Sequence, residues 1–261
     1  MTKAPYTTQL QAGLGMVDET RSLLDLWHDG MEPSSLSQAA LESGRFPTMS
    51  ARRIRNLVIE CFAPRLLIGA AKPALHLKIL ATMLAPREFT QLLFIHACRA
   101  NVILRDFVRE VYWSFYTAGH ETISNDTARE FVARAIQDQK TAKPWSTATI
   151  RRVASYLTGC CADFGLLEAG EKSVRKILPF RIEARVVAVL AYELHFAGRT
   201  DHRIIADQDW ALFGLDHADI LEEFRRLSLK GLLIRHFPYG ASLEPIQSRN
   251  GPHLTTRPPR V

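Results

Sequence analysis

A helical period of apolar residues constrains the fold more than any other feature of this sequence. It runs from Asp18 to about Gln139 with few strand signals, because apolar side chains return at i, i+3, i+4 and i+7. Pro73 and Pro86 stand where the period restarts, and proline is favoured at the first position of a helix. The pattern predicts helices at residues 19–28, 34–43, 49–62, 73–84, 87–98, 101–117 and 125–140.

The composition is that of a globular protein, with 47% hydrophobic residues and 33 Lys+Arg against 27 Asp+Glu. A chain of 261 residues can bury a sizeable core, and its length favours two domains. No apolar run approaches the roughly 20 residues that a membrane-spanning helix needs. The N-terminal segment MTKAPYTTQL lacks the apolar stretch of a secretory signal. We therefore expect a cytoplasmic protein without a membrane partner.

The character of the sequence changes after Pro144, where helical segments end in Gly-Leu-Leu and lead into short ribbons. We interpret residues 1–144 as an all-helical N-terminal domain. Residues 145–247 are interpreted as a winged-helix-like domain whose helix-turn-helix begins near residue 125. The expected fold is thus mainly α, a helical bundle with helix-turn-helix motifs and a winged-helix-like C-terminal half. Residues 248–261 are rich in Pro and Arg, which predicts a disordered tail.

Two segments after Pro144 follow one plan. Each starts with a capping residue, Ser146 or Asp216, and ends with a glycine, Gly165 or Gly231, that precedes Leu-Leu. The offsets between the caps and between the glycines predict that the second helix is about one turn shorter than the first. A diverged duplication would explain the likeness, and so would the common rules of helix capping.

The net charge of +6 is unevenly distributed, since positive charge gathers in residues 48–80 and again in residues 145–185. Two basic blocks fit a surface that binds a polyanion, although a solvated surface is the alternative.

Arg151 and Arg152 open the helix of the second block, where the helix dipole disfavours cations by roughly 0.3 to 1 kcal/mol. One apolar stripe is expected to face the core, made of Ile150, Val153, Ala154, Leu157, Cys161 and Phe164. The arginines then face outward at the start of the second helix of a helix-turn-helix, where such motifs contact DNA. We predict DNA contacts from Arg151, Arg152, Ser155 and Tyr156. Ion pairs with acidic residues of another helix are the alternative.

The ribbon LLEAGEKSVRKILPF after this helix is predicted to be a wing whose Lys172, Arg175 and Lys176 touch phosphates. A second candidate helix-turn-helix spans residues 34–62, and its second helix again opens with arginines, namely Arg52, Arg53 and Arg55. These arginines are expected to contact DNA, unless they pair with carboxylates of the acidic first 47 residues.

Other chemistry finds little support. Cys61, Cys98, Cys160 and Cys161 form no CxxC pair and have no histidine at zinc-finger spacing, so we expect reduced, mostly buried thiols and no metal site. Walker A, HExxH and G-x-S-x-G motifs are missing. We therefore expect no catalytic residues, no cofactor and no enzymatic activity.

A series of short motifs spans nearly the whole chain: Tyr6-Thr7, Gly13-Leu14, Asp18-Glu19, the run Ser50 to Arg55, Phe62-Ala63-Pro64-Arg65, the run Arg105 to Val111, Trp145-Ser146-Thr147, Gly165-Leu166-Leu167, and Leu212-Phe213-Gly214-Leu215 leading to Gly231. In order and spacing they resemble the motifs of the BrxA family, whose members are accessory proteins of the BREX phage-defence system. The resemblance implies a mainly α-helical protein with helix-turn-helix motifs that binds double-stranded DNA. It further implies a role in host defence beside a methyltransferase and other components, and it carries over no catalytic residue.

The sequence and the resemblance together favour a non-enzymatic double-stranded DNA-binding accessory protein of a BREX system. We expect a monomer that contacts DNA and other BREX components. The alternative is a protein-interaction adaptor that assembles the defence complex without reading DNA.

Overall fold

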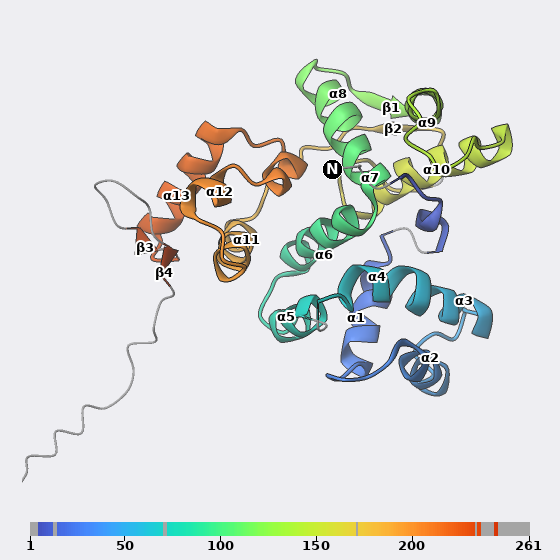
Figure 1. Ribbon diagram of the computed structural model, residues 1–261, viewed down its shortest axis with the longest axis horizontal. Helices are drawn as coiled ribbons and strands as arrows, with labels where there is room; N and C mark the ends of the chain where they lie inside the picture. Colours follow the sequence, from blue (N-terminus) through green and yellow to red (C-terminus); the bar gives the residue numbers. More distant parts are fainter. Residues whose placement is uncertain are drawn as a thin grey trace, which may run out of the picture. The chain divides into compact units, whose positions relative to one another are not determined.

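The computed structural model describes residues 5–12, 15–69, 72–170, 172–232, 234–235 and 243–244. The expected tail, residues 248–261, lies outside the described residues. The described chain is mostly helical, which confirms the mainly α fold (Figure 1). In this part of the chain, no helix is both long enough and apolar enough to span a membrane.

The chain forms two compact units. Unit 1 comprises Met1–Val186 and Gln208–Leu215, and unit 2 comprises Val187–Asp207 and Asp216–Val261. The boundary expected after residue 144 falls inside unit 1, because the helices on either side of it pack against each other in the structure.

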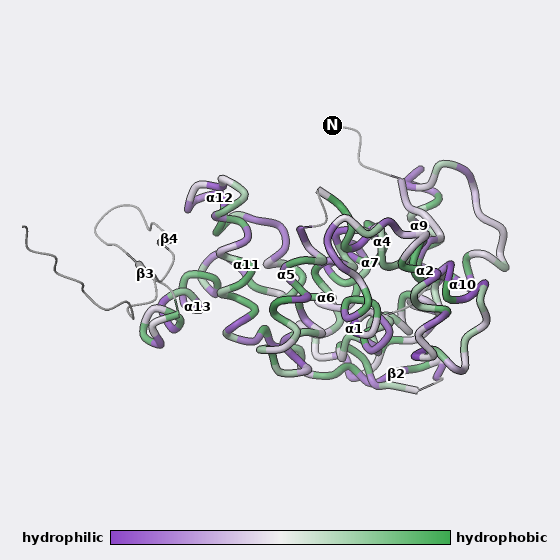
Figure 2. Tube along the Cα trace, turned by 90° about the horizontal axis from the view of Figure 1, so that it is seen from below, coloured by the Kyte–Doolittle hydropathy of each residue, from purple (hydrophilic) through white to green (hydrophobic). Residues whose placement is uncertain are grey.

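The helices expected before residue 118 are present, with ends shifted by a few residues. The helical segments in this part of the chain are η1 (Gln9–Ala12), α1 (Val17–Leu26), α2 (Pro33–Glu42), α3 (Ala51–Asn56), η2 (Leu57–Phe62), α4 (Ala63–Leu66), α5 (Lys72–Leu80), α6 (Pro86–Ala100), α7 (Val102–Phe107), η3 (Val108–Tyr112) and α8 (Trp113–Thr117). Of these, η1 and α4 were not predicted from the sequence. The segments η2 and η3 are π-helical, and each lies inside a continuous longer helix. Helix α6 is buried along most of its length, and Figure 2 shows hydrophobic stretches around it.

The second half of unit 1 combines two helices with a short sheet. Strand β1 (Thr122–Ser124) leads into α9 (Asn125–Gln137), a loop leads to α10 (Thr147–Asp163), and β2 (Val174–Lys176) returns antiparallel to β1. An antiparallel bridge between Leu167 and Ile177 closes a hairpin that includes β2. Both helices begin at a capping serine, because Ser124 and Ser146 accept hydrogen bonds from the backbone N–H three residues later. The cap at Ser146 was predicted from the sequence, and the cap at Ser124 was not.

Four phenylalanines from distant parts of the chain form the centre of the unit 1 core. The ring of Phe94 lies 5.3 Å from Phe164, 5.5 Å from Phe180 and 5.8 Å from Phe213, and the last two rings stack at 5.6 Å. Aromatic pairs at these separations stabilise a core beyond the area that they bury.

The segment η4 (Gln208–Phe213) belongs to this core although most of its neighbours in sequence belong to unit 2. The Trp113 indole donates a hydrogen bond to the Leu212 carbonyl over 3.0 Å. Arg99 forms a 2.8 Å ion pair with the buried Asp209. These contacts explain why residues 208–215 complete unit 1.

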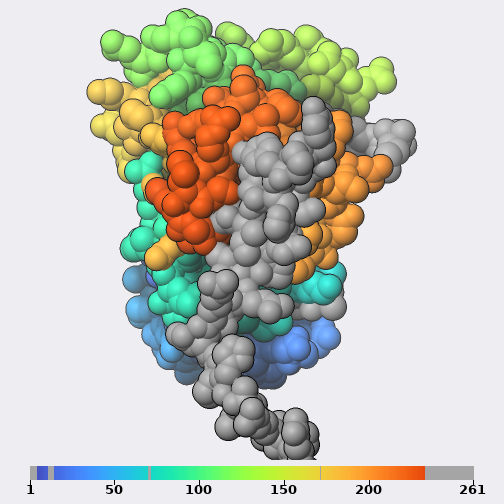
Figure 3. All heavy atoms as spheres, turned by 90° about the vertical axis from the view of Figure 1, so that its left-hand side faces the viewer, coloured from blue at the N-terminus to red at the C-terminus, as the bar shows by residue number. Residues whose placement is uncertain are grey.

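Unit 2 contains most of α11 (Ala184–Phe196) together with α12 (Asp201–Ile205), α13 (His217–Leu229) and the antiparallel strands β3 (Ile234–Arg235) and β4 (Leu243–Glu244). Helices α11, α12 and α13 are drawn in orange to red in Figure 3, as is the segment of residues 208–215 that belongs to unit 1. Helices α10 and α13 end alike: Leu166 N–H donates to Cys161 and Leu232 N–H donates to Leu227, each just after a glycine with positive φ. With 17 residues against 13, α13 is one turn shorter, as the sequence predicted.

Candidate nucleic-acid interface

Helix α10 has the orientation that its apolar period predicted. Val153, Ala154 and Leu157 are buried on one face, and Cys161 and Phe164 continue that face. Ile150 is only half-buried, because it lies in the first turn beside the exposed loop. The later turns are buried more completely than expected, since Thr158 and Gly159 are also inside.

Arg151 and Arg152 point away from this buried face and are exposed. Within the part of the chain that the structure describes, neither guanidinium forms an ion pair, so the expected alternative of acidic partners is not found there. Ser155 is exposed and Tyr156 is half-buried one turn further along. The second turn of α10 thus presents two unneutralised cations to solvent.

The loop before α10 adds a feature that the sequence reasoning missed. Lys143 is exposed in this loop, three residues before the capping Ser146. A cation just before a capped helix was the available signal, but nothing in a single sequence tells such a lysine from any other surface lysine.

The hairpin after α10 carries less free positive charge than expected. Its strands are joined by Glu168 N–H donating to the Lys176 carbonyl over 2.9 Å. The Lys172 ammonium lies 2.7 Å from the Glu168 carboxylate and lowers the pKa of that carboxyl by hydrogen bonding and charge. Lys172 is therefore partly neutralised, whereas Lys176 is exposed and forms no ion pair among the described residues.

Arg175 was expected to contact phosphates at the surface, but its side chain is buried. It pairs with Ile123 across the β1–β2 ladder, is buried, and donates from Nη1 to the Glu168 carbonyl over 2.9 Å. Side chains alternate between the two faces of a strand. Because its neighbours in β2 face solvent, Arg175 faces the core. Its hydrogen bond to Glu168 links the two strands of the hairpin.

Arg52, Arg53 and Arg55 are all exposed along α3, and the structure describes no ion pair for any of them. Ser50 caps this helix by accepting a hydrogen bond from Arg53 N–H over 3.3 Å. The predicted turn before it is a loop of residues 43–50, longer than the turn of a compact helix-turn-helix.

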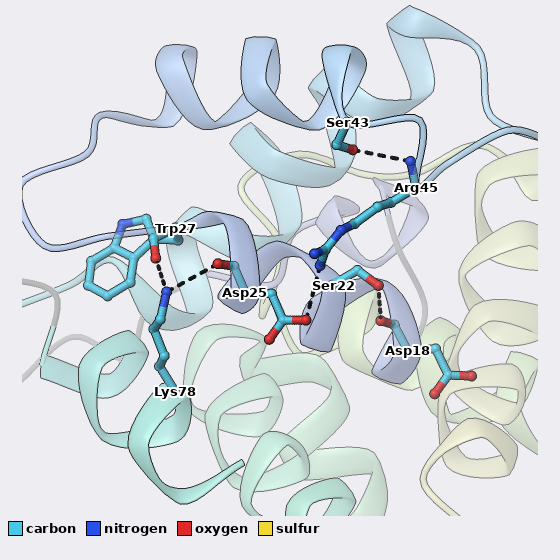
Figure 4. A network of polar contacts seen from close by, with 7 residues as sticks. All are labelled: Asp18, Ser22, Asp25, Trp27, Ser43, Arg45 and Lys78. Atoms are coloured by element: carbon cyan, nitrogen blue, oxygen red, sulfur yellow. Dashed lines mark hydrogen bonds and ion pairs between the residues drawn. The ribbon is translucent and has the colours of Figure 1, made fainter. Parts of the chain in front are cut away.

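An acidic residue near the N-terminus, Asp25, forms an ion pair with an arginine outside α3. Asp25 forms a 3.0 Å ion pair with Arg45, in the loop after α2, and Lys78 of α5 donates to the backbone carbonyls of Asp25 and Trp27 (Figure 4). Asp25 is thus satisfied without the arginines of α3.

The segment that begins with α3 is similar to the segment that begins with α7. The stretch RNLVIECF at residues 55–62 matches RDFVREVY at residues 105–112, and each stretch includes π-helical turns. At the same offset, Arg52 and Arg53 correspond to Val102 and Ile103 of α7, and Ile103 is buried. Helix α7 thus has apolar residues at the two positions where α3 has exposed arginines. In Figure 1, α3 and α10 begin on the same side of unit 1.

The four cysteines are buried, as expected. Burial raises the pKa of each thiol, to about 12 for Cys160. At neutral pH they are protonated and unsuited to nucleophilic or metal-binding chemistry.

The chain is similar to a known protein family and to a solved structure. The family model of BrxA matches residues 4–193. A crystal structure of an uncharacterized protein from Magnetospirillum magneticum is similar with a TM-score of 0.54 and 14% sequence identity, covering 74% of this chain and 95% of that chain. At this identity the likeness concerns the fold alone. No curated protein matches the sequence.

Proposed function

The chain belongs to the BrxA family and is thus a BREX-associated protein, and from that premise we propose that it binds double-stranded DNA without catalysing a reaction. The proposed site is the exposed start of α10 with the loop before it. Arg151, Arg152, Ser155, Tyr156 and Lys143 supply its contacts.

The connectivity around α10 supports this proposal. Helix α8 is followed by β1, the helix pair α9 and α10, and a hairpin whose second strand, β2, pairs back to β1. This is the order of a winged helix, and in helix-turn-helix proteins the N-terminal residues of the second helix enter the major groove. Lys176, and Lys172 in part, would then face the phosphates beside the groove.

The two arginines at the start of α10 carry the proposal. Both guanidinium groups are exposed in the second turn of α10, and no carboxylate among the described residues pairs with either of them. DNA phosphates would compensate both charges, and a guanidinium can also read the edge of a guanine. The free arginines of α3 would add phosphate contacts from a second basic surface.

Binding measured over a range of salt concentrations tests the proposal. We expect Arg151→Ala/Arg152→Ala to weaken binding to unrelated duplexes to a similar degree, and to lower the log–log salt slope by about 0.9 for each lost phosphate contact. The matched control is Arg225→Ala/Arg226→Ala on α13, another adjacent pair, because those arginines are paired with Glu222 and Glu223.

The control should bind with parental affinity and slope. Parental binding by the α10 variant would refute the site, and a loss limited to one duplex sequence would assign the arginines to base recognition.

A role as a protein-interaction adaptor is the second candidate. Leu75, Ile79 and Met83 are 39%, 57% and 62% exposed at a spacing of four residues on and just after α5, and exposed apolar stripes of this kind commonly mark protein contacts. If the adaptor role accounts for the basic surfaces, duplex binding will be weak and will show no dependence on Arg151 or Arg152.

A further inference from the structure

The residues next to the N-terminus lie along the loop that leads into α10. Residues 5–7, here called the strap, run beside Lys140 and Thr141. Tyr6 N–H donates to the Lys140 carbonyl over 2.7 Å, and Tyr6 forms a parallel bridge with Thr141. The strap therefore holds the start of the loop between α9 and α10 by its backbone.

The Tyr6 side chain anchors the strap deep in unit 1. Tyr6 is 3% exposed, and its hydroxyl donates to Asp106 Oδ2 over 2.8 Å. Asp106 is itself buried and accepts a second hydrogen bond from Arg105 over 3.2 Å. A hydrogen bond to a buried carboxylate is stronger than one between neutral groups. Burial, and after it the carboxylate of Asp106, raise the pKa of Tyr6, so the hydroxyl stays a donor throughout the physiological range.

The same side chain also contacts the start of the loop and the helix before it. The Tyr6 ring stacks on Phe131 of α9 at 6.3 Å, and the Lys140 ammonium lies 5.8 Å from the ring centre. Lys140 further pairs with Glu110 at 3.8 Å. One residue thus connects α7, α9 and the loop, and the loop ends at the cap of the helix that carries Arg151.

We propose that Tyr6 is a positioning residue for nucleic-acid binding: through the strap it fixes the loop of residues 138–146, and with it Lys143 and the first turn of α10. This proposal rests on the proposed function. A loop held in one conformation before binding loses less entropy when it meets a ligand, so anchoring it raises affinity without adding a contact.

The test replaces Tyr6 with Phe, which keeps the ring, its stacking on Phe131 and the backbone hydrogen bond, and removes only the hydroxyl. Amide hydrogen exchange should accelerate about tenfold at residues 139–150 while the rest of unit 1 exchanges at the parental rate. The matched control is Tyr192→Phe in unit 2, where a tyrosine hydroxyl donates to the Leu232 carbonyl over 3.2 Å. The control should leave exchange at residues 139–150 unchanged.

The second measurement is affinity for a duplex of mixed sequence at several salt concentrations. Tyr6→Phe should weaken binding roughly five- to tenfold with an unchanged salt slope, because the phosphate contacts stay the same in number. Unchanged exchange at residues 139–150 would overturn the proposal, and so would accelerated exchange with parental affinity. If the parent chain itself fails to bind duplex, the proposed function is refuted, and the exchange data still decide whether Tyr6 holds the loop.

Discussion

The Thr158 hydroxyl in the middle of α10 donates a hydrogen bond to the side-chain oxygen of Asn125, the first residue of α9, over 2.6 Å. Thr158 is 1% exposed, so this bond replaces water at a buried contact between the two helices. This hydrogen bond sets the position of α10 along α9. It therefore also sets the place from which Arg151 and Arg152 project.

Replacing Thr158 with Val keeps the shape of the side chain and removes its hydroxyl. The oxygen of Asn125 then loses its partner, so we expect the free energy of unfolding to fall by about 1–3 kcal/mol. Urea denaturation measures this change. Thr147→Val at the exposed first residue of α10 is the control and should differ from the parent by less than about 0.5 kcal/mol. A Thr158→Val protein as stable as the parent would mean that the hydrogen bond contributes nothing.

Leu157 and Ile150 lie on the same stripe of α10 but differ in burial. Leu157 is fully buried, and its replacement with Ala should lower the free energy of unfolding by about 2–5 kcal/mol. Ile150 is half-buried, so Ile150→Ala should cost about 1 kcal/mol, since less apolar area returns to water. Thermal unfolding compares the two. Equal losses would contradict the observed orientation of α10.

Gly214 and Gly165 both adopt a positive φ, +67° and +81°, but only Gly214 is crowded. A Cβ on Gly214 would lie 2.6 Å from the Trp113 ring, whereas one on Gly165 would meet nothing within 4 Å. Gly165→Ala should therefore cost about 1–2 kcal/mol from backbone strain alone. Gly214→Ala should cost about 2–5 kcal/mol, because overpacking adds to the strain. Similar losses in denaturant titrations would show that Trp113 moves aside freely.

Much of this fold could be predicted from sequence because its helices are long and amphipathic. The stripe of α10, the caps at Ser146 and Asp216 and the glycine ends depend on side chains within one or two turns of each other, so local rules suffice. The π-helical turns of η2 and η3 could not be predicted in this way. They add one residue to a turn within an otherwise normal helix and leave the apolar period nearly unchanged.

Features that depend on contacts between distant segments could not be predicted from the sequence. Strands β1 and β2 have three residues each, too few for an alternating pattern, and without their pairing the burial of Arg175 was invisible. Residues 208–215 join unit 1 through Trp113 and Arg99, about a hundred positions earlier in the chain. In the candidate site, the orientation of Arg151 followed from the helix period, whereas the neutralisation of Lys172 and the role of Tyr6 required three-dimensional contacts.

The buried cysteines make a prediction about pH. Burial raises each thiol pKa above its ordinary value, to about 12 for Cys160. The thiols of the unfolded chain ionise near pH 8.5, so the unfolded state gains stability from ionisation first. The contribution of the protonated thiols is fully present below about pH 8.5 and is lost as the pH rises towards 12. Chemical denaturation at a series of pH values should show this decline.

The same burial predicts slow alkylation. At pH 8, iodoacetamide should modify the native protein no faster than it unfolds, and all four cysteines should react at once in denaturant. Rapid modification of any cysteine in the native protein would contradict the burial seen here.

Glu168 provides the last prediction, a substitution that should strengthen DNA binding. Its carboxylate neutralises Lys172 across 2.7 Å, on the hairpin that the proposed site places beside the phosphates. Glu168→Gln keeps the backbone contacts of this residue with Lys176 and Arg175, removes one negative charge and releases the lysine. Affinity for duplex should rise and the salt slope should steepen by up to about 0.9, as expected for one added phosphate contact. Glu222→Gln is the control, since it likewise removes one negative charge and releases Arg225 from its ion pair, but on α13 of unit 2. An equal gain in both variants would mean that net charge alone governs binding. If Glu168→Gln binds duplex no more tightly than the parent, the hairpin does not contact the DNA. Beside a phosphate, the freed Lys172 would form a new ion pair with it and raise the affinity.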